Sequence, residues 1–172
     1  MSPRQILLFG DERLEAPNAP VEDFGPELAQ LVNLLFETGW KAPGLGVAAP
    51  QIGVNLRLAT IDLSVGKDPD QKTVLANPEI IATQGMISLE EGCLSFPGIF
   101  TTISRPRELV VRAQDLDGSW REIEASGLLA QAVCHEVDHL DGRLLVHHLR
   151  GIKRTMFLRR VAKMRKTGVW TA

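Results

Sequence analysis

The segment His135-Glu136-Val137-Asp138-His139 constrains the fold most, because it places two imidazoles four residues apart. On an α-helix, residues four positions apart lie on one face, so both rings can reach one metal ion. Glu136 then lies beside any water bound to that ion, which is the arrangement of metal-dependent hydrolases. We therefore expect a helix here that carries two metal ligands.

The bounds of this helix follow from its flanking residues. Ser126 is a good N-cap residue, and Gly142 stands where a glycine commonly follows a helix. The apolar residues between them are Leu128, Leu129, Ala132, Val133, Val137 and Leu140. They cover much of the helix surface, which predicts burial on most sides and therefore rigidly held ligands.

A catalytic site of this kind usually takes three protein ligands, so a third is needed. Cys134 would point about 100° away from His135 around the helix. His147 and His148 follow the helix break and are expected to be ordinary polar residues. A lone cysteine is more often a small buried apolar residue. Cys93 is nevertheless the best candidate, because its segment is rich in glycine and proline and predicts a tight loop.

Two further motifs accompany the histidine pair. They are the glycine-rich Gly44–Gln51 and the segment Gly92–Ser95, which is preceded by Glu91. Together with His135–Leu140, in this order, they resemble the motifs of the peptide deformylases, and the similarity spans about residues 5–150. The glycine-rich motif lacks the Gly-Lys-Ser/Thr ending of a phosphate-binding loop, and no Rossmann spacing follows it.

The resemblance implies an α+β fold, with antiparallel β-sheets surrounding the central metal-binding helix and with N-terminal and C-terminal helices. It implies a metal-dependent hydrolase that removes the formyl group from the N-terminal formylmethionine of newly made polypeptides and releases formate. Cys93, His135 and His139 would bind one divalent ion. The resemblance implies Fe²⁺ in the cell, although the same ligands would suit Zn²⁺, Ni²⁺ or Co²⁺.

The resemblance also implies a mechanism. A bound metal lowers the pKa of a water ligand from near 16 towards roughly 7. Glu136 would accept the water's proton during attack on the formyl carbon and then protonate the leaving amine. The side-chain amide of Gln51 and the backbone N–H of Leu94 would stabilise the oxyanion.

Further residues are assigned by the same resemblance. The methionine pocket would be lined by Leu45, Leu89, Leu128 and Ala132, and the backbone near Gly46 would pair with the extended peptide. Asp138 would pair with Arg105 and so hold the helix against the loop after Cys93. The alternative is that Asp138 is an exposed carboxylate.

Three positions depart from the family's usual pattern. Cys134 stands where glutamine is usual, Gln131 where an apolar residue or arginine is frequent, and Phe100 where some members carry arginine. These departures leave the chemistry intact and bear on pocket preference. A second thiol near an oxidisable metal also predicts greater sensitivity to oxygen.

Length and composition fit one soluble domain over residues 1–172, since 44% of the residues are hydrophobic and 23% charged. The apolar Ile6–Phe9 is too short for a signal peptide, and no apolar run reaches the roughly 20 residues that span a bilayer. With one of two cysteines proposed as a ligand, a disulfide framework is not expected, which fits a reducing cytoplasm. We expect no membrane partner and a monomer.

Apolar periodicity predicts the remaining elements. A helix is expected over Phe24–Gly39, with Pro26 near its first position and Gly39 at its end. The predicted strands are Leu56–Leu63, Lys72–Ala82, Glu108–Gln114 and Trp120–Ala125, with a turn at Asp115–Gly118.

The C-terminal segment is strongly basic. Eight of the 19 Lys and Arg residues, and none of the 21 Asp and Glu residues, follow residue 149. We expect a helix at about 150–167, with an incomplete apolar stripe from Ile152 and Met156, and with Phe157, Val161 and Met164 beside it. It is either a solvated helix docked by its apolar edge or an electrostatic contact with ribosomal RNA. Because the proposed catalytic residues all precede residue 140, removing residues 153–172 is expected to spare peptide hydrolysis.

Three other functions share some of these features. A zincin-type endopeptidase would take its third ligand downstream of the helix, whereas Cys93 lies upstream. An inactive relative would be expected to lack Glu136 or Gln51, and both are present. An RNA-binding module would leave the metal-ligand pattern without a purpose.

Overall fold

The computed structural model describes residues 4–168 and 170, so residues 1–3, 169, 171 and 172 of the predicted domain lie outside it. Its α-helices are α1 (Pro26–Lys41), α2 (Gly127–Leu140) and α3 (Gly151–Lys166). Its strands are β1 (Gly46–Ala48), β2 (Leu58–Asp62), β3 (Lys72–Gly92), β4 (Phe100–Gln114) and β5 (Trp120–Ser126). Short 3-10 helices lie at Glu12–Leu14, Ala49–Ile52, Pro69–Gln71 and Leu145–His148.

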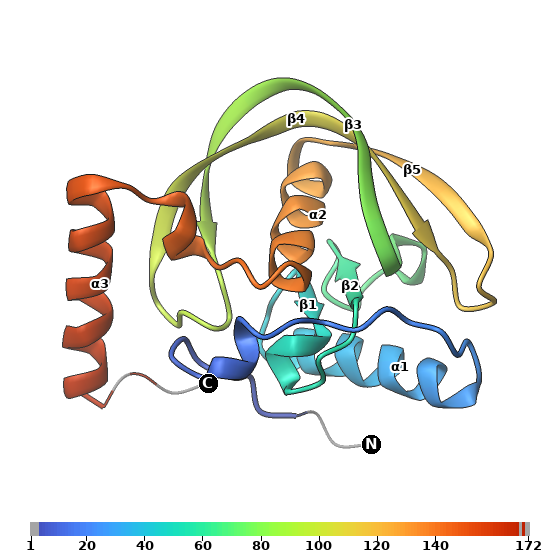
Figure 1. The fold of residues 1–172 in the computed structure, drawn as a ribbon, viewed down its shortest axis with the longest axis horizontal. Coiled ribbons are helices and arrows are strands. Elements are labelled where there is room, and N and C mark those ends of the chain that lie inside the picture. The colour runs from blue at the N-terminus through green and yellow to red at the C-terminus, as the bar shows by residue number, and fades with distance from the viewer. Residues whose placement is uncertain (1–3, 169, 171–172) are drawn as a thin grey trace.

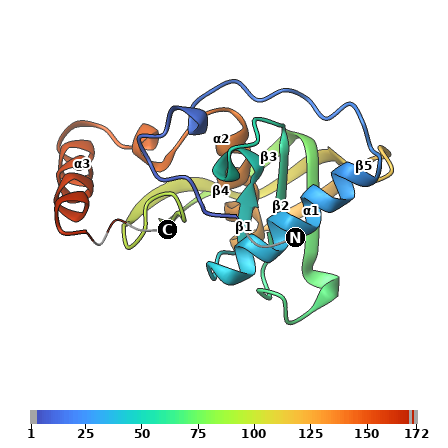
Figure 2. The same cartoon turned by 90° about the horizontal axis from the view of Figure 1, so that it is seen from below.

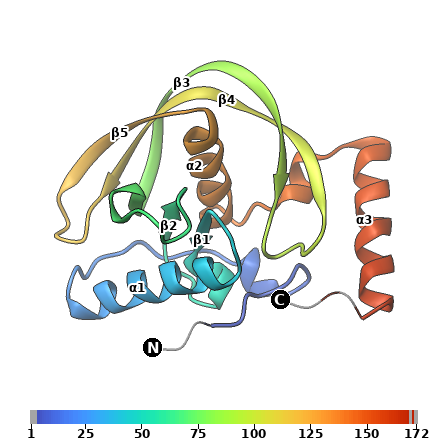
Figure 3. The same cartoon turned by 180° about the vertical axis from the view of Figure 1, so that it is seen from behind.

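The five strands form one antiparallel sheet in the order β1-β2-β3-β4-β5. Strands β3 and β4 form a long ribbon that arches over α2 (Figure 1), and the view from behind shows the same arrangement (Figure 3). A register shift between Ile80 and Ala82 interrupts the ribbon, and such bulges bend a strand. The predicted α+β class is therefore confirmed, although the strands form one sheet rather than several.

Helix α2 lies at the centre because its apolar faces pack against the sheet. Ala130 and Val133 of α2 share a fully buried cluster with Val111 and Ala113 of β4. Ser126 occupies the N-cap position as predicted, but its side chain makes no capping hydrogen bond. Gly142 adopts a φ of +66°, which lets the chain turn away after the helix.

Helix α1 begins at Pro26, as predicted, and lies across β1 and β2 when the molecule is viewed from below (Figure 2). Its predicted end was wrong. Gly39 lies inside the helix and is buried. A Cβ atom at this position would lie 3.1 Å from Val47 Cγ2, so only a glycine allows this close approach of α1 to β1. The glycine therefore marks close packing of α1 on β1 rather than a helix terminus.

The predicted strands lie where the structure has strands, but β3 and β4 are longer than predicted. β3 continues ten residues beyond the predicted end at Ala82, and β4 begins eight residues before Glu108. Residues 81–86 of β3 are all exposed, and alternation of burial appears only from Ile87 to Glu91. Backbone pairing with β4, from Thr83↔Leu109 to Gly92↔Phe100, holds this part of β3 as a strand.

The C-terminal helix α3 forms where it was predicted and docks by an apolar edge. Only part of the predicted apolar stripe is buried in this contact. Ile152 and Met156 are 76% and 62% exposed, whereas Phe157 and Val161 are buried in a cluster with Phe96. The ring centroids of Phe96 and Phe157 are 5.2 Å apart. Removing residues 153–172 would open this core, so we expect such a truncation to reduce hydrolysis, contrary to the expectation from sequence.

No helix in the described part of the chain combines the length and the apolar character that crossing a membrane requires.

Candidate metal centre

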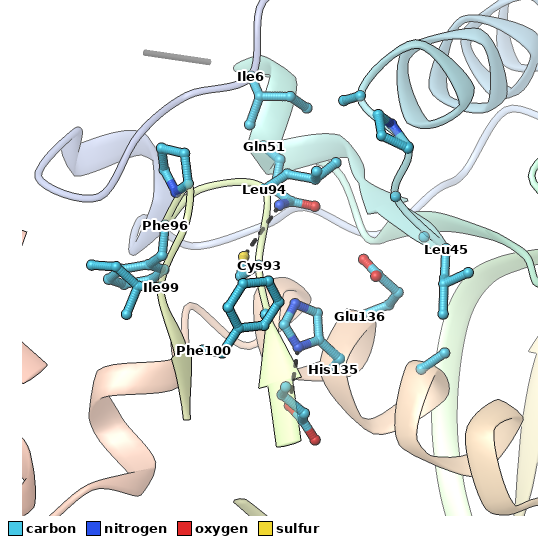
Figure 4. A pocket seen from close by; sticks show the side chains of 18 of the residues that line it. Ile6, Leu45, Gln51, Cys93, Leu94, Phe96, Ile99, Phe100, His135 and Glu136 are labelled. Carbon is cyan, nitrogen blue, oxygen red and sulfur yellow. Dashed lines mark hydrogen bonds and ion pairs between the residues drawn. The ribbon is translucent and has the colours of Figure 1, made fainter. Parts of the chain in front are cut away.

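The three predicted ligands come together beneath the arch. Cys93 follows the end of β3, and His135 and His139 project from one face of α2. Their ligand atoms all lie within 4.8 Å of one another, and Cys93 Sγ is 3.3 Å from His139 Nε2. Two imidazoles and one thiol at this spacing match the donor set of a catalytic divalent metal. Figure 4 shows Cys93 and His135 at the wall of a cavity.

The electrostatics of Cys93 favour the form that binds metals. Burial by itself would raise the pKa of its thiol. The charges of His139 and His135 outweigh burial and hold that pKa well below its ordinary value. A thiolate is the metal-binding form of cysteine, so the residues present fit a divalent ion.

Glu91 holds the first histidine. His135 Nδ1 lies 3.2 Å from Glu91 Oε2, which leaves Nε2 of the ring to face the other ligands. Arg105 donates to both oxygens of Glu91, at 2.7 and 2.9 Å. Burial alone would raise the pKa of Glu91, but Arg105 and His135 lower it to about 2. Glu91 is therefore an ionised anchor for His135.

The contact of Glu91 with His135 was not predicted, although Glu91 precedes the motif Gly92–Ser95 directly. A carboxylate that precedes a candidate ligand by two residues was the only available signal. Strand alternation could have indicated that residues 91 and 93 share a face, but the strand was predicted to end at Ala82. The pairing of Asp138 with Arg105 was predicted and is confirmed, at 2.6 Å between Oδ2 and Nη1.

The histidines after α2 stand apart from the ligand group, as expected. His148 Nε2 lies 2.6 Å from Asp138 Oδ2, and His147 Nε2 lies 3.1 Å from Glu15 Oε1. Cys134 also lies outside the group and is buried among apolar residues. Burial raises the pKa of the Cys134 thiol to about 11, which keeps it neutral and weakens the prediction of oxygen sensitivity.

Glu136 is buried at the cavity beside the ligand group. Its side chain reaches into the cavity near His135 (Figure 4), and the residue is only 3% exposed. Its Oε2 makes no hydrogen bond within the described part of the chain. Burial is the main cause that raises the pKa of Glu136 to about 7, against the lowering effect of the His135 and His139 charges. Such a carboxyl can both accept and donate a proton near neutral pH.

Gln51 and Leu94 both lie next to Cys93. Gln51 Oε1 accepts a hydrogen bond from the Ala48 N–H at 3.0 Å, which fixes the orientation of the amide. Its Nε2 then points toward Cys93 Sγ, at 3.6 Å, and donates to Ser95 Oγ at 3.2 Å. The Leu94 N–H directly follows the cysteine, and among the residues described no partner accepts from it. Two donors are therefore available beside the ligand group.

The cavity has a volume of about 560 Å³ and adjoins Cys93, His135 and Glu136. Four of the five predicted substrate residues line it, namely Leu45, Gly46, Leu128 and Ala132. Leu89 is half-buried on β3 and is not part of the lining, so its assignment stays a prediction. Phe100, 56% exposed, and Gln131 also line the cavity, which gives two of the unusual positions direct access to a ligand.

The comparison that decides the family is a match of residues 3–155 to the model named polypeptide deformylase. The chain belongs to this family. Its members remove N-formyl groups from nascent peptides. The chain is similar to the peptide deformylase of Acidobacterium capsulatum, with 47% identity over 167 residues, which covers 97% of this chain and 98% of the relative.

Solved peptide deformylases share the fold. The structure from Legionella pneumophila superposes with a TM-score of 0.91 at 42% identity, covering 99% of this chain and 100% of that one. The structure from Synechococcus elongatus, in complex with actinonin, gives 0.87 at 34% identity, with 93% and 88% covered. A deformylase assignment therefore replaces the zincin and RNA-binding alternatives.

Proposed function

We propose that this deformylase acts on the N-terminal formylmethionine of newly made polypeptides and releases formate, with residues 1–172 forming one catalytic domain. The observation that carries the proposal is Glu136. A buried carboxyl whose Oε2 has no hydrogen-bond partner among the described residues lies beside a Cys-His-His ligand group in one cavity. Metal-dependent hydrolases that add water to a carbonyl use this pairing of metal ligands and a proton-transferring carboxylate.

Cys93, His135 and His139 would hold the metal. When bound, a divalent ion supplies Lewis-acid chemistry, lowering the pKa of water and polarising a carbonyl. Glu136, buried at the cavity wall beside His135, takes the proton of the attacking water and delivers it to the leaving amine. Both transfers use one carboxylate, whose Oε2 is free of competing hydrogen bonds in the described residues.

Gln51 and Leu94 would stabilise the oxyanion. The Gln51 amide is held by Ala48 so that Nε2 faces the Cys93 side of the cavity. The Leu94 N–H belongs to the loop that carries Cys93, so both donors are fixed before substrate arrives. Fixed donors stabilise developing charge without reorganising during the reaction.

The substrate would bind as an extended strand. β1 is the edge strand of the sheet, and its first residue, Gly46, lines the cavity. An exposed strand edge binds a peptide through backbone hydrogen bonds. Leu45, Leu128 and Ala132 would receive the methionine side chain, with Leu89 a further predicted contact.

The metal in the cell is proposed to be Fe²⁺, with Zn²⁺, Ni²⁺ or Co²⁺ possible in purified protein. The choice of iron rests on the resemblance to the family, and the donor set of one thiolate and two imidazoles is compatible with each of these ions. Metal analysis of protein purified without oxygen, set against protein purified in air, tests the choice. Iron in the anaerobic sample and its loss in air are expected, and zinc in both samples would contradict the iron proposal.

A cytoplasmic monomer that docks on the ribosome is also proposed. Support for docking comes from exposed bases on α3, including Lys153, Arg154, Arg159 and Lys163. Replacing these four residues with glutamine should reduce ribosome co-sedimentation at low salt and weaken its salt dependence. Hydrolysis of a free formyl-peptide should be unchanged. Unchanged co-sedimentation would mean that α3 is simply a solvated helix.

The substrate proposal is tested by formate release from N-formyl-Met-Ala-Ser, with N-acetyl-Met-Ala-Ser as the control. We expect formate and a free methionine amine from the first peptide and no product from the second. Cleavage of the Met-Ala bond in either peptide would indicate an endopeptidase and contradict the proposal.

A further inference from the structure

The carboxylate of Asp138 is fully occupied by hydrogen-bond donors from three side chains. Its Oδ2 accepts from Arg105 Nη1 and from His148 Nε2, each at 2.6 Å. Its Oδ1 accepts from Arg143 Nη2 at 2.7 Å and Nε at 3.1 Å. Two oxygens with about four acceptor sites are thus saturated. The predicted pair of Asp138 and Arg105 therefore leaves the contacts of Arg143 and His148 without an explanation.

The two additional donors reach Asp138 from the surface. The side chains of Arg143 and His148 are 57% and 21% exposed, whereas that of Asp138 is 8% exposed. Their backbone is firmly held: Arg143 N donates to Asp138 O at 2.7 Å, and the 3-10 helix that ends at His148 buries Leu145 and Val146. Both groups are therefore fixed against α2 rather than loosely attached.

A continuous set of charged contacts joins Asp138 to a candidate metal ligand. Arg105 bonds Asp138 with Nη1 and bonds Glu91 with Nε and Nη2, and Glu91 contacts His135 Nδ1. Arg105, Glu91 and Asp138 are all less than 10% exposed. Two buried carboxylates thus share one buried guanidinium.

This sharing makes the two outer donors, Arg143 and His148, important. A buried carboxylate that loses its partners is costly, and it attracts whatever donor remains. Without Arg143 and His148, Arg105 would be the sole side-chain donor to Asp138 in the described contacts. The guanidinium would then be drawn toward Asp138 and away from Glu91, which would loosen the hold of Glu91 on His135. Groups that orient a metal-bound histidine govern metal affinity.

We infer that Arg143 and His148 are positioning residues of the metal centre, acting on His135 through Asp138, Arg105 and Glu91. The inference rests on the proposed ligand set of Cys93, His135 and His139. It gives a function to His148, which the sequence marks only as a polar residue after a helix break. Neither residue lines the cavity, so neither acts on the substrate directly.

The test uses the cobalt-loaded enzyme and three variants, Arg143→Met, His148→Leu and the double variant. The measurements are the rate of cobalt loss to a chelator, the visible absorption of bound cobalt, and kcat and KM for a formyl-peptide. Each single variant should lose cobalt about tenfold faster. The visible bands should shift, and kcat should fall with little change in KM.

The matched control is Arg57→Met. Arg57 Nη1 donates to Leu140 O at 3.2 Å and to Asp141 Oδ1 at 2.9 Å, so it secures the same end of α2 without contacting Asp138. Loosening the helix end alone should leave the cobalt spectrum and release rate as in the unaltered enzyme. His148→Gln retains an N–H donor near the position of Nε2, so its cobalt spectrum and cobalt release rate should match those of the unaltered enzyme. Arg143→Lys should give a release rate between those of the unaltered enzyme and Arg143→Met.

The effects of Arg143→Met and His148→Leu should be non-additive in the double variant, because both residues bond the same carboxylate. Release rates and spectra that match those of Arg57→Met would overturn the inference while leaving the ligand set intact. Failure of the unaltered enzyme to bind cobalt would instead overturn the proposed ligand set, and the inference with it.

Discussion

Gly46 and Glu136 lie so close together that a Cβ atom on residue 46 would collide with the carboxylate, lying 2.9 Å from its Cδ. Gly46 is the first residue of the edge strand β1, and Glu136 comes from α2. The glycine therefore does more than expose backbone to a peptide. It leaves the space in which the Glu136 carboxylate lies.

Gly46→Ala should displace the Glu136 carboxylate while preserving the fold. A shift of about 1 Å in a catalytic group can lower the rate about a hundredfold, so we expect a loss of that order in kcat/KM. Gly25→Ala is the control, since a Cβ there lies 3.0 Å from the exposed Asp23 carboxylate, outside the cavity. Near-normal activity in Gly46→Ala would show that the carboxylate tolerates displacement.

Glu136→Gln should retain the metal and lose turnover by about 10²–10⁴-fold, because the amide keeps the shape but cannot carry the proton. Glu136→Asp should also be poor, since the shorter side chain withdraws the carboxylate by about 1.5 Å. Formate release and metal content are measured together. Glu124→Gln, an exposed position on β5, is the control. A Glu136→Gln enzyme with a near-normal rate would leave the mechanism without a proton carrier.

The fold away from the site predicts a pH dependence of stability at Asp62. Its oxygens accept from Ser64, Gly66 and Trp40. Burial alone would raise the pKa of Asp62, but these hydrogen bonds outweigh burial and lower it. A carboxyl with a lowered pKa stabilises the fold above its unfolded value, near 3.8, and this contribution is lost as the pH falls through the folded pKa.

Asp62→Asn should therefore destabilise the protein at pH 7, and the difference from the unaltered protein should narrow as the pH falls below about 4. Urea unfolding across this pH range measures the effect, with the exposed Asp70→Asn as the control. If the difference in unfolding free energy between the two proteins stays constant with pH, ionisation of Asp62 does not stabilise the fold.

Phe157→Ala tests whether α3 belongs to the core. Phe157 is 6% exposed and packs against Phe96, which lines the cavity, so its removal should cost about 3–5 kcal/mol. Ile152→Ala, on the same helix but 76% exposed, should stay within about 0.5 kcal/mol. The two free energies of unfolding are compared by urea titration. Equal values would mean that α3 is dispensable for the fold.

The sequence was most informative where spacing alone determines geometry. Histidines four apart on a helix must share a face, so spacing points to His135 and His139. Cys93 was the best remaining candidate, because Cys134 points away from His135 and the segment of Cys93 is rich in glycine and proline. The long ribbon of β3 could not be predicted, because residues such as Met86 are exposed and only backbone pairing with β4 holds them. Likewise, Gly39 resembles a helix terminus until its packing on Val47 is seen.

The buried charges were only partly predictable. The resemblance indicated the pair of Asp138 and Arg105. It did not indicate that Asp138 would accept hydrogen bonds from two further side chains. The contacts of Glu91 with His135, and of Arg143 and His148 with Asp138, depend on the arch of β3 and β4 and on the turn after α2. The two-residue spacing of Glu91 and Cys93 is a weak signal for the first arrangement, and spacing carries none for the second.

The central claim is that Cys93, His135 and His139 hold one catalytic divalent ion, and metal content per chain in Cys93→Ala tests it most directly. Cys134→Ala is the matched control, because it removes the other cysteine and leaves the ligand group untouched. We expect about one ion per chain and formate release in Cys134→Ala, and neither in Cys93→Ala. Full metal content in Cys93→Ala, with activity retained, would contradict the account.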